Sequence, residues 1–431
     1  MKKRIIGGLK FTGTVALCLV CSILLGTLLL TAVYMLPTEP MDKNLGRSAE
    51  VFQSEGVRPD VFKWCSSRLD NYTDSFILLL AVYDGGESPL VEAMELERNH
   101  ITTQNSPTAD IVAHYINGEE FDTFYGVSRY LGGFLVYTKP LLLLTTYQNI
   151  RIINGVCQTL AFAAVIFLLV KQGFKRYIAP YCLAVAFLMP VTLAMSLQYS
   201  PCYYIMTFGC IALLLMRRRS LRRVSLLFLF IGIATVYFDF LTYPIATVGV
   251  PLALYFAISE RKGFLSDCAY LVLPGACWGV GYGGMWLGKW ITVSVVTKSN
   301  AFVTVLRKIR ERTDNDPAEF AGKLVEDPSF TAIKRNIKAF IKTPVSILAF
   351  ALVIALALLI LYALFTKRLP VSELTVAVPF AVLALLPMVW YWCTANHSII
   401  HYWFTHKALV STAFSGMCVL TRLAFRIKLK K

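Results

Sequence analysis

Two aspartates in the first third of the chain have a spacing that suits acid–base chemistry. Asp70 and Asp74 lie four residues apart, directly before an apolar stretch, so a helix there would present both carboxylates on one face. These two aspartates are the catalytic candidates, because a carboxylate can accept a proton from a hydroxyl group or hold a divalent cation. The structural alternative is that an Asp only caps a helix beginning near Ser75. Asp74 suits that role better, so Asp70 is the preferred base.

Later polar residues are candidates for substrate binding. Asp239 is the only acidic residue between about 123 and 259, and such an isolated carboxylate among aromatic residues is costly at the end of a membrane span unless it is paired or used. Asn396 precedes His397 and His401, whose imidazoles can hydrogen-bond a phosphate. The structural alternatives are that Asp239 lies in a solvated turn and that the histidines anchor a span at the membrane interface.

Basic residues near the same loops suit an anionic substrate. Arg129, Lys139 and the basic segment 298–342 are the candidates, because an arginine fork matches the oxygens of a phosphate. A segment that only binds lipid headgroups is the alternative. The sequence indicates no cofactor and no zinc site, since two histidines lack a third ligand, although a divalent cation is compatible with the carboxylates. A disulfide between Cys65 and Cys393 is also compatible with the sequence.

Membrane helices must position these residues. The chain has 431 residues, of which 56% are hydrophobic, more than a soluble protein of this size can bury. The predicted fold class is all-α: a polytopic transmembrane helical bundle of about ten spans, with a large extracytoplasmic first loop that carries interfacial helices. The spans are expected at 12–35, 150–170, 178–196, 200–216, 224–238, 243–258, 267–289, 344–365, 371–391 and 408–424.

Basic stretches alternate with these spans and predict their orientation. Half of the 42 Lys and Arg residues fall in six short stretches, and short loops of this kind stay in the cytoplasm. Both termini are therefore expected in the cytoplasm, and the candidate residues outside it. The net charge of +16 follows from this pattern, so nucleic acid is not an expected partner. The stretches are 1–10, 171–176, 217–223, 261–262, 367–368 and 422–431.

The spans divide the chain into five parts. The region 36–149 contains 16 of the 26 acidic residues, and its apolar stretches 74–83 and 124–144 are expected to lie at the membrane interface. The parts are a tail with a retained first transmembrane helix (1–35), an extracytoplasmic loop with interfacial helices (36–149), transmembrane helices two to seven (150–289), a basic extracytoplasmic loop (290–343), and transmembrane helices eight to ten with a basic cytoplasmic tail (344–431).

Taken together, this layout resembles the type C glycosyltransferase superfamily, whose many-spanning members use sugars linked to a lipid phosphate. In that family a first span precedes a large outer loop with interfacial helices and an acidic catalytic residue near its start, the place of Asp70 and Asp74 here. The resemblance implies that one of them is the general base, and that Arg, His and Lys residues of later outer loops hold the lipid phosphate. Residues 68–74, 237–244 and 396–405 also resemble bacterial membrane proteins of surface-polysaccharide type.

The resemblance implies an enzyme of the bacterial cell membrane that acts in surface-glycan assembly. It would transfer a sugar, with inversion, from a polyprenyl-phosphate donor to a glycan, lipid or protein acceptor, with membrane lipids as further partners. Catalysis requires groups from separate loops to meet, so we expect one outward-facing cavity to be lined by Asp70 or Asp74, by Asp239, and by His397 or His401. The rivals are a polysaccharide polymerase or ligase built on the 290–343 loop, and a transporter or flippase with charged residues inside its spans.

Overall fold

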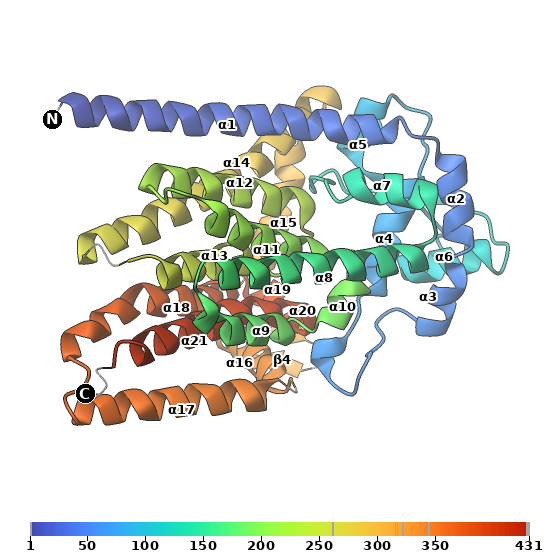
Figure 1. Ribbon diagram of the computed structural model, residues 1–431. Helices are drawn as coiled ribbons and strands as arrows, with labels where there is room; N and C mark the ends of the chain where they lie inside the picture. Colours follow the sequence, from blue (N-terminus) through green and yellow to red (C-terminus); the bar gives the residue numbers. More distant parts are fainter. Residues whose placement is uncertain are drawn as a thin grey trace.

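The protein is an elongated bundle of helices with a cluster of shorter helices at one end (Figure 1). The computed structural model describes residues 2–260, 263–314, 316, 318–320, 323–343 and 345–427. Over these residues the structure is almost entirely helical, as the sequence predicts, with only two small antiparallel sheets of two strands each. The all-α class is therefore confirmed.

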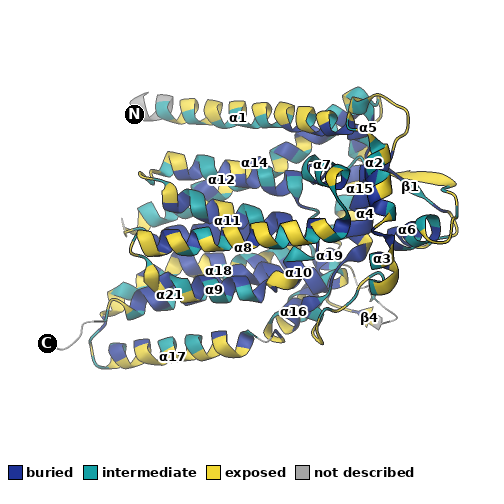
Figure 2. Ribbon diagram, turned by 45° about the vertical axis from the view of Figure 1, so that its right-hand side comes forward, coloured by how far each residue is buried: buried dark blue, intermediate teal, exposed yellow. Residues whose placement is uncertain are grey.

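Six of the described helices are long and apolar enough to cross a membrane. α1 and α17 lie at opposite edges of the bundle and expose much of their apolar surface, as expected where a helix faces lipid (Figure 2). The six are α1 (Lys2–Tyr34), α8 (Tyr147–Lys171), α12 (Leu221–Phe238), α14 (Phe264–Val296), α17 (Ser346–Phe365), and α18 (Ala377–Cys393) together with the short helix η3 (Val371–Val376).

The prediction of about ten spans is wrong by this measure of length and hydropathy. In the predicted span 178–196, α9 (Ile178–Phe187) ends before Met189, which adopts a left-handed φ of 57°, and Pro190 then starts the short α10 (Pro190–Ala194). The other three predicted spans contain helices of 14 to 16 residues, below the roughly 20 that a crossing needs. They are α11 (Ser200–Leu215), α13 (Ile245–Ile258) and α21 (Val410–Ala424).

Both chain ends lie at one end of the bundle, opposite the cluster of shorter helices (Figure 1). The connections α8–α9, α11–α12, α13–α14 and α17–α18 lie at that same end, because successive helices run in opposite directions. The described parts of the basic stretches therefore gather there. The pair at 261–262 and residues 428–431 lie outside the described residues.

Two glycines of α14, Gly281 and Gly284, are explained by helix packing. A Cβ atom on Gly281 would meet the carbonyl oxygen of Leu229, and one on Gly284 would meet the side chain of Leu19. The glycines of α14 therefore let α12 and α1 approach closely, which is a common way for membrane helices to pack.

The cluster of shorter helices, which we call the outer cluster, comes mainly from residues 36–149. Its central helix, α4 (Asn71–Val82), is dark blue along most of its length in Figure 2, and Leu78, Leu79 and Leu80 are fully buried. The expectation of an interfacial helix at 74–83 is therefore wrong, because α4 is surrounded by protein. The surrounding helices are α2 (Thr38–Gly46), α3 (Ala49–Glu55), α5 (Pro89–Glu95), α6 (Pro107–Tyr115) and α7 (Leu135–Leu144).

A small sheet and two later helices complete the outer cluster. The strands β1 (Glu97–His100) and β2 (Thr123–Gly126) pair antiparallel, so the predicted interfacial stretch 124–144 divides into a strand and α7. The basic region 290–343 forms α15 (Ala301–Thr313) and α16 (Pro328–Ile341) around a second hairpin. The remaining elements are β3 (Ala318–Phe320), β4 (Lys323–Val325), α19 (Ala395–Ile400), α20 (Tyr402–Thr405), η1 (Cys65–Ser67), η2 (Lys175–Tyr177) and η4 (His406–Leu409).

Candidate functional site

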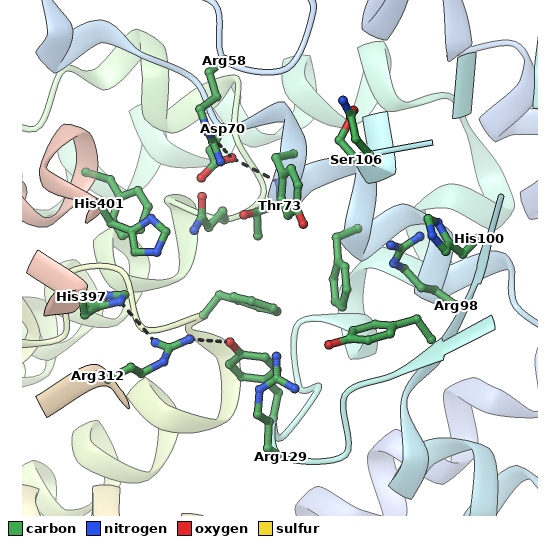
Figure 3. A pocket seen from close by; sticks show the side chains of 18 of the residues that line it. Arg58, Asp70, Thr73, Arg98, His100, Ser106, Arg129, Arg312, His397 and His401 are labelled. Atoms are coloured by element: carbon green, nitrogen blue, oxygen red, sulfur yellow. Dashed lines mark hydrogen bonds and ion pairs between the residues drawn. The ribbon is translucent and has the colours of Figure 1, made fainter. Parts of the chain in front are cut away.

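A polar cavity of about 410 Å³ lies in the outer cluster, against the end of the bundle (Figure 3). Its walls come from segments that are far apart in the sequence: the first loop, α4, the β1–β2 hairpin, α15, α19 and the turn after α12. The lining residues are Arg58, Asp70, Tyr72, Thr73, Phe76, Arg98, His100, Gln104, Asn105, Ser106, Tyr125, Arg129, Tyr130, Gln198, Phe240, Arg312, His397, His401 and Phe404.

Asp70 is the only carboxylate among these lining residues. Its side chain accepts a hydrogen bond from the backbone N–H of Thr73 at 3.3 Å, which caps α4, and its Oδ1 lies 3.9 Å from Nε of Arg58. Burial raises the pKa of Asp70 to about 6, while Arg58 favours the ionised form. A carboxylate with this pKa is largely ionised at pH 7 and is matched to proton acceptance near neutral pH.

The structure reverses the capping roles that the sequence suggests. α4 begins at Asn71 and not near Ser75, so Asp70 is the capping residue and Asp74 lies in the first helical turn. The reason for preferring Asp70 as the base, that Asp74 was needed as the cap, is therefore wrong. Asp70 nevertheless reaches the cavity, whereas Asp74 does not line it.

Asp74 instead ties the outer cluster to the bundle. Its fully buried carboxylate accepts hydrogen bonds from the Tyr147 hydroxyl at 2.5 Å, the Ser196 hydroxyl at 3.1 Å, and the backbone N–H groups of Leu197 at 2.9 Å and Gln198 at 3.0 Å. These bonds fix the turn between α10 and α11 and thereby hold Gln198 in the cavity wall. The geometry gives Asp74 a structural role at this junction.

Replacing Asp74 with Ala is expected to destabilise the protein strongly. Each buried donor left without an acceptor costs about 1–3 kcal/mol, and the change affects several donors at once. Thermal unfolding of the detergent-purified protein should shift to clearly lower temperature. Asp122→Ala is the control, because Asp122 is exposed and accepts only from Thr102. Equal midpoints for the two variants would contradict the structural role.

Arg312 and Arg129 give the cavity uncompensated positive charge. Arg312, on α15, donates from Nη2 to the Tyr130 hydroxyl at 2.8 Å. Arg129 lies over the ring of Tyr130, with its Cζ 4.7 Å from the ring centroid, and its buried Nε has no hydrogen-bond partner. Within the described part of the chain, neither arginine forms an ion pair with a carboxylate. Together they make this side of the cavity suited to a phosphate, whereas Arg58 lies across the cavity beside Asp70 (Figure 3).

His397 and His401 lie beside these arginines and are neutral. The ring nitrogen Nε2 of His397 is 3.0 Å from the carbonyl oxygen of Leu241, so it carries the hydrogen and leaves Nδ1 to accept from Arg312 at 3.3 Å. Burial lowers the pKa of His397 well below its usual range and that of His401 to about 3, and Arg312 adds to both shifts. His397 therefore positions the Arg312 guanidinium.

Three of the residues predicted to bind substrate do not line the cavity. The Asp239 carboxylate is buried and accepts from the backbone N–H and hydroxyl of Thr242, within the turn that presents the Leu241 carbonyl to His397. The Lys139 ammonium donates to the Ala81 carbonyl at 2.8 Å in the core of the outer cluster. The Asn396 amide donates to the Glu311 carbonyl and joins α19 to α15. Structural partners account for Asp239 and Lys139, whereas the buried Oδ1 of Asn396 has no hydrogen-bond partner among the described residues.

The expected convergence is therefore met in part. One cavity is lined by Asp70, Arg129, His397 and His401, but Asp239 does not line it. Within the described residues, no three His, Cys, Asp or Glu side chains come together in a way that could hold a metal ion. Cys65 and Cys393 are both free, so the disulfide that the sequence allowed does not form.

Four basic residues of the cavity were not singled out from the sequence: Arg58, Arg98, His100 and Arg312. Arg312 belongs to the basic segment 298–342, but nothing in its spacing distinguishes it from its neighbours. Figure 3 shows Arg98 and His100 on the side of the cavity opposite His397 and His401. Only the pairing of distant segments brings these residues together.

An apolar groove of about 690 Å³ lies next to the cavity, between α8, α11 and α12. Leu197 and Phe238 line the groove, whereas their near neighbours Gln198 and Phe240 line the cavity. The two spaces therefore lie on either side of the same short segments. The groove follows the apolar helices of the bundle, and its lining is almost wholly hydrophobic and aromatic.

The fold and the site together define a helical protein with six candidate membrane-spanning helices and an arginine-rich cavity at one end of its bundle. No family model, no curated protein and no solved structure matches the chain. The function is therefore argued from the cavity itself.

Proposed function

We propose that this protein is an integral membrane glycosyltransferase that transfers a sugar from a polyprenyl-phosphate donor to an acceptor on the extracytoplasmic face. The observation that carries the proposal is the meeting of one buried carboxylate, Asp70, with Arg129 and Arg312 in a single cavity, where neither arginine forms an ion pair with a described carboxylate. A carboxylate and several cations around one space match the needs of a reaction with a nucleophilic hydroxyl and a departing phosphate.

Asp70 acts as the general base in this proposal. The acceptor hydroxyl gives its proton to the Asp70 carboxylate, and its oxygen forms a bond to the anomeric carbon of the donor sugar. The anomeric carbon–oxygen bond to the phosphate breaks, and the lipid phosphate leaves with the electron pair. Arg129 and Arg312 stabilise the charge on that phosphate, and attack from the opposite side inverts the anomeric configuration.

The apolar groove supports a lipid-linked donor. A polyprenyl chain lying between α8, α11 and α12 keeps its apolar surface in contact with hydrophobic side chains and bilayer. Because Leu197 lines the groove and Gln198 lines the cavity, a tail in the groove has its phosphate at the edge of the polar site. A soluble nucleotide-sugar would make no use of this groove.

The proposal is tested by incubating the purified protein in lipid nanodiscs with a panel of polyprenyl-phosphate sugars carrying a labelled hexose. We expect the label to leave the lipid, slowly to water and faster when an acceptor is present, and free polyprenyl phosphate to inhibit the reaction. Intact donor throughout the panel would overturn the enzyme proposal. In sealed proteoliposomes, movement of uncleaved donor from one leaflet to the other would favour the transporter hypothesis instead.

A polysaccharide polymerase or ligase is the second candidate, and one observation favours it. Arg312 enters the cavity from α15, which belongs to the late basic region 290–343 on which that hypothesis depends. The two candidates differ in the unit that is transferred. Release of single sugars supports the glycosyltransferase, whereas transfer of preassembled oligosaccharides from a lipid diphosphate supports the polymerase.

We further propose a bacterial cell-membrane location, with both termini in the cytoplasm and the cavity outside, from the basic connections at the opposite end of the bundle. In a background without native cysteines, Ser220→Cys should react with a membrane-impermeant maleimide only after the cells are permeabilised. Glu87→Cys, an exposed position in the outer cluster, should react in intact cells. Labelling of Ser220→Cys from outside would show that this orientation is wrong.

A further inference from the structure

We infer that the wall of the cavity formed by the β1–β2 hairpin and the adjoining turn at 102–106 binds a saccharide, which serves as the acceptor. The binding of a saccharide is argued from this wall alone, whereas its role as acceptor rests on the glycosyltransferase proposed above. The wall lies across the cavity from His397 and His401 (Figure 3). It differs from that side in charge and in the shape of its side chains.

The register of the hairpin places one aromatic ring on the cavity wall. Arg98 is directly opposite Tyr125, and His100 is two residues from Arg98, so the three side chains share one face of the sheet. All three line the cavity. Tyr125 is 49% exposed, which leaves its ring available for stacking. Phe124, the adjacent strand residue, belongs to the other face and does not line the cavity.

The charge on this wall is already compensated. The buried Asp110 carboxylate pairs with Arg98 Nη1 at 2.7 Å and with His100 Nδ1 at 3.0 Å, and it also accepts from the backbone N–H of Ile101. Because Asp110 neutralises the Arg98 guanidinium, Arg98 has no net charge with which to bind an anion. It also fixes the imidazole through Nδ1, which leaves His100 Nε2 as the ring nitrogen free to hydrogen-bond a ligand.

Two amides add neutral hydrogen-bonding groups to the same wall. Gln104 donates from its Nε2 to Glu119 at 3.3 Å, which leaves its carbonyl oxygen to accept from a ligand. Asn105 is exposed and, over the described part of the chain, its side chain forms no hydrogen bond. An amide can both donate to and accept from a hydroxyl group.

This combination fits a sugar ring better than a phosphate, a lipid or an apolar peptide. A pyranose has an apolar face of C–H groups, which stacks on an exposed aromatic ring, and a rim of hydroxyls that both donate and accept hydrogen bonds. Tyr125 offers the ring, and His100, Gln104 and Asn105 offer the hydrogen-bonding partners. A saccharide on this wall occupies the same cavity as Asp70, so one of its hydroxyls is the natural source of the proton that Asp70 accepts.

The inference is tested by saturation-transfer NMR on the detergent-purified full-length protein. The probes are methyl glycosides of glucose, galactose, mannose and N-acetylglucosamine, and the β-linked disaccharides of these sugars. We expect at least one probe to receive saturation, most strongly at its axial ring protons. Tyr125→Leu should weaken its binding roughly tenfold, and Asn105→Ala should weaken it in the same direction.

Phe124→Leu is the matched control, because it removes an exposed aromatic ring from the opposite face of the same strand. Binding should survive that change. Absence of saturation on every probe, or equal loss in Phe124→Leu and Tyr125→Leu, would overturn the inference. Asn105 is exposed and without bonded partners, so Asn105→Ala remains informative if the Tyr125 variant does not fold.

The outcome separates this inference from the function on which the acceptor role rests. A protein that cleaves the lipid-linked donor but binds none of the sugars refutes the saccharide wall and leaves the enzyme proposal standing. A protein that binds sugars through Tyr125 but never cleaves the donor keeps the saccharide wall and refutes the enzyme proposal. In the active enzyme, Tyr125→Leu should raise the KM for the acceptor while donor hydrolysis by water continues.

Discussion

Asp70→Asn is expected to reduce sugar transfer by on the order of a hundredfold or more while the protein stays folded. The amide keeps the shape of the carboxylate and an oxygen that can accept from the N–H of Thr73, so the cap of α4 is preserved. It cannot accept a proton from the acceptor hydroxyl. The measurement is the initial rate of transfer from a polyprenyl-phosphate sugar in nanodiscs, compared at equal amounts of folded protein.

The pH profile distinguishes loss of a base from general damage. Because the pKa of Asp70 is raised to about 6, the ionised base is lost as the pH falls through 6, and wild-type activity should fall with it. The small residual activity of Asp70→Asn should not show this decrease at acidic pH. Asp60→Asn is the control, because Asp60 pairs with Arg68 at the surface, outside the cavity. Near-normal transfer by Asp70→Asn would refute the proposed mechanism.

Arg312→Ala is expected to reduce transfer roughly a hundredfold to a thousandfold. The guanidinium is held by His397 and Tyr130, so it reaches the phosphate site without a reorganisation during the reaction. Removing it leaves the departing phosphate with less charge stabilisation. Arg312→Lys should recover only part of the rate, because an ammonium lacks the two-pronged geometry that matches phosphate oxygens. The measurement is the same transfer assay at saturating donor.

Arg310→Ala provides the matched control, since Arg310 has the same charge, lies on the same helix and faces solvent away from the cavity. A surface charge of this kind is screened by salt and should change the rate little. Equal losses in the two variants would indicate that α15 contributes only general positive charge. Equal rates in Arg312→Ala and the wild type would show that Arg312 does not take part in the transfer reaction.

The sequence predicts the general architecture because that architecture depends on composition. Long apolar segments require helices in a bilayer, where each backbone group must find its partner within the segment. The sequence does not predict correctly how many helices are long enough to cross. Met189 and Pro190 divide a segment that is apolar throughout, and a window average does not register a single left-handed residue.

The candidate site is likewise predicted only in part by the sequence. The aspartates, Arg129 and the histidines stand out in the sequence because polar side chains are expensive among apolar segments. The sequence separates Asp70 from Asp74 only by an expected cap at Ser75 that the structure does not have. In the structure Asp70 lines the cavity, and Asp74 is satisfied by Tyr147 and the turn at 196–198. Spacing of four residues establishes a shared helical face, but it does not show which neighbour covers each end of that face.

By itself, the sequence determined that this protein is helical and apolar and where its polar candidates lie along the chain. Only the tertiary structure decided that Asp239 and Lys139 are occupied by internal partners and that Arg312 and His100 belong to the cavity. The physical reason is that a buried polar side chain must be hydrogen-bonded, and its partner commonly comes from a distant segment. Periodicity is local, whereas the satisfaction of polar groups depends on the whole fold.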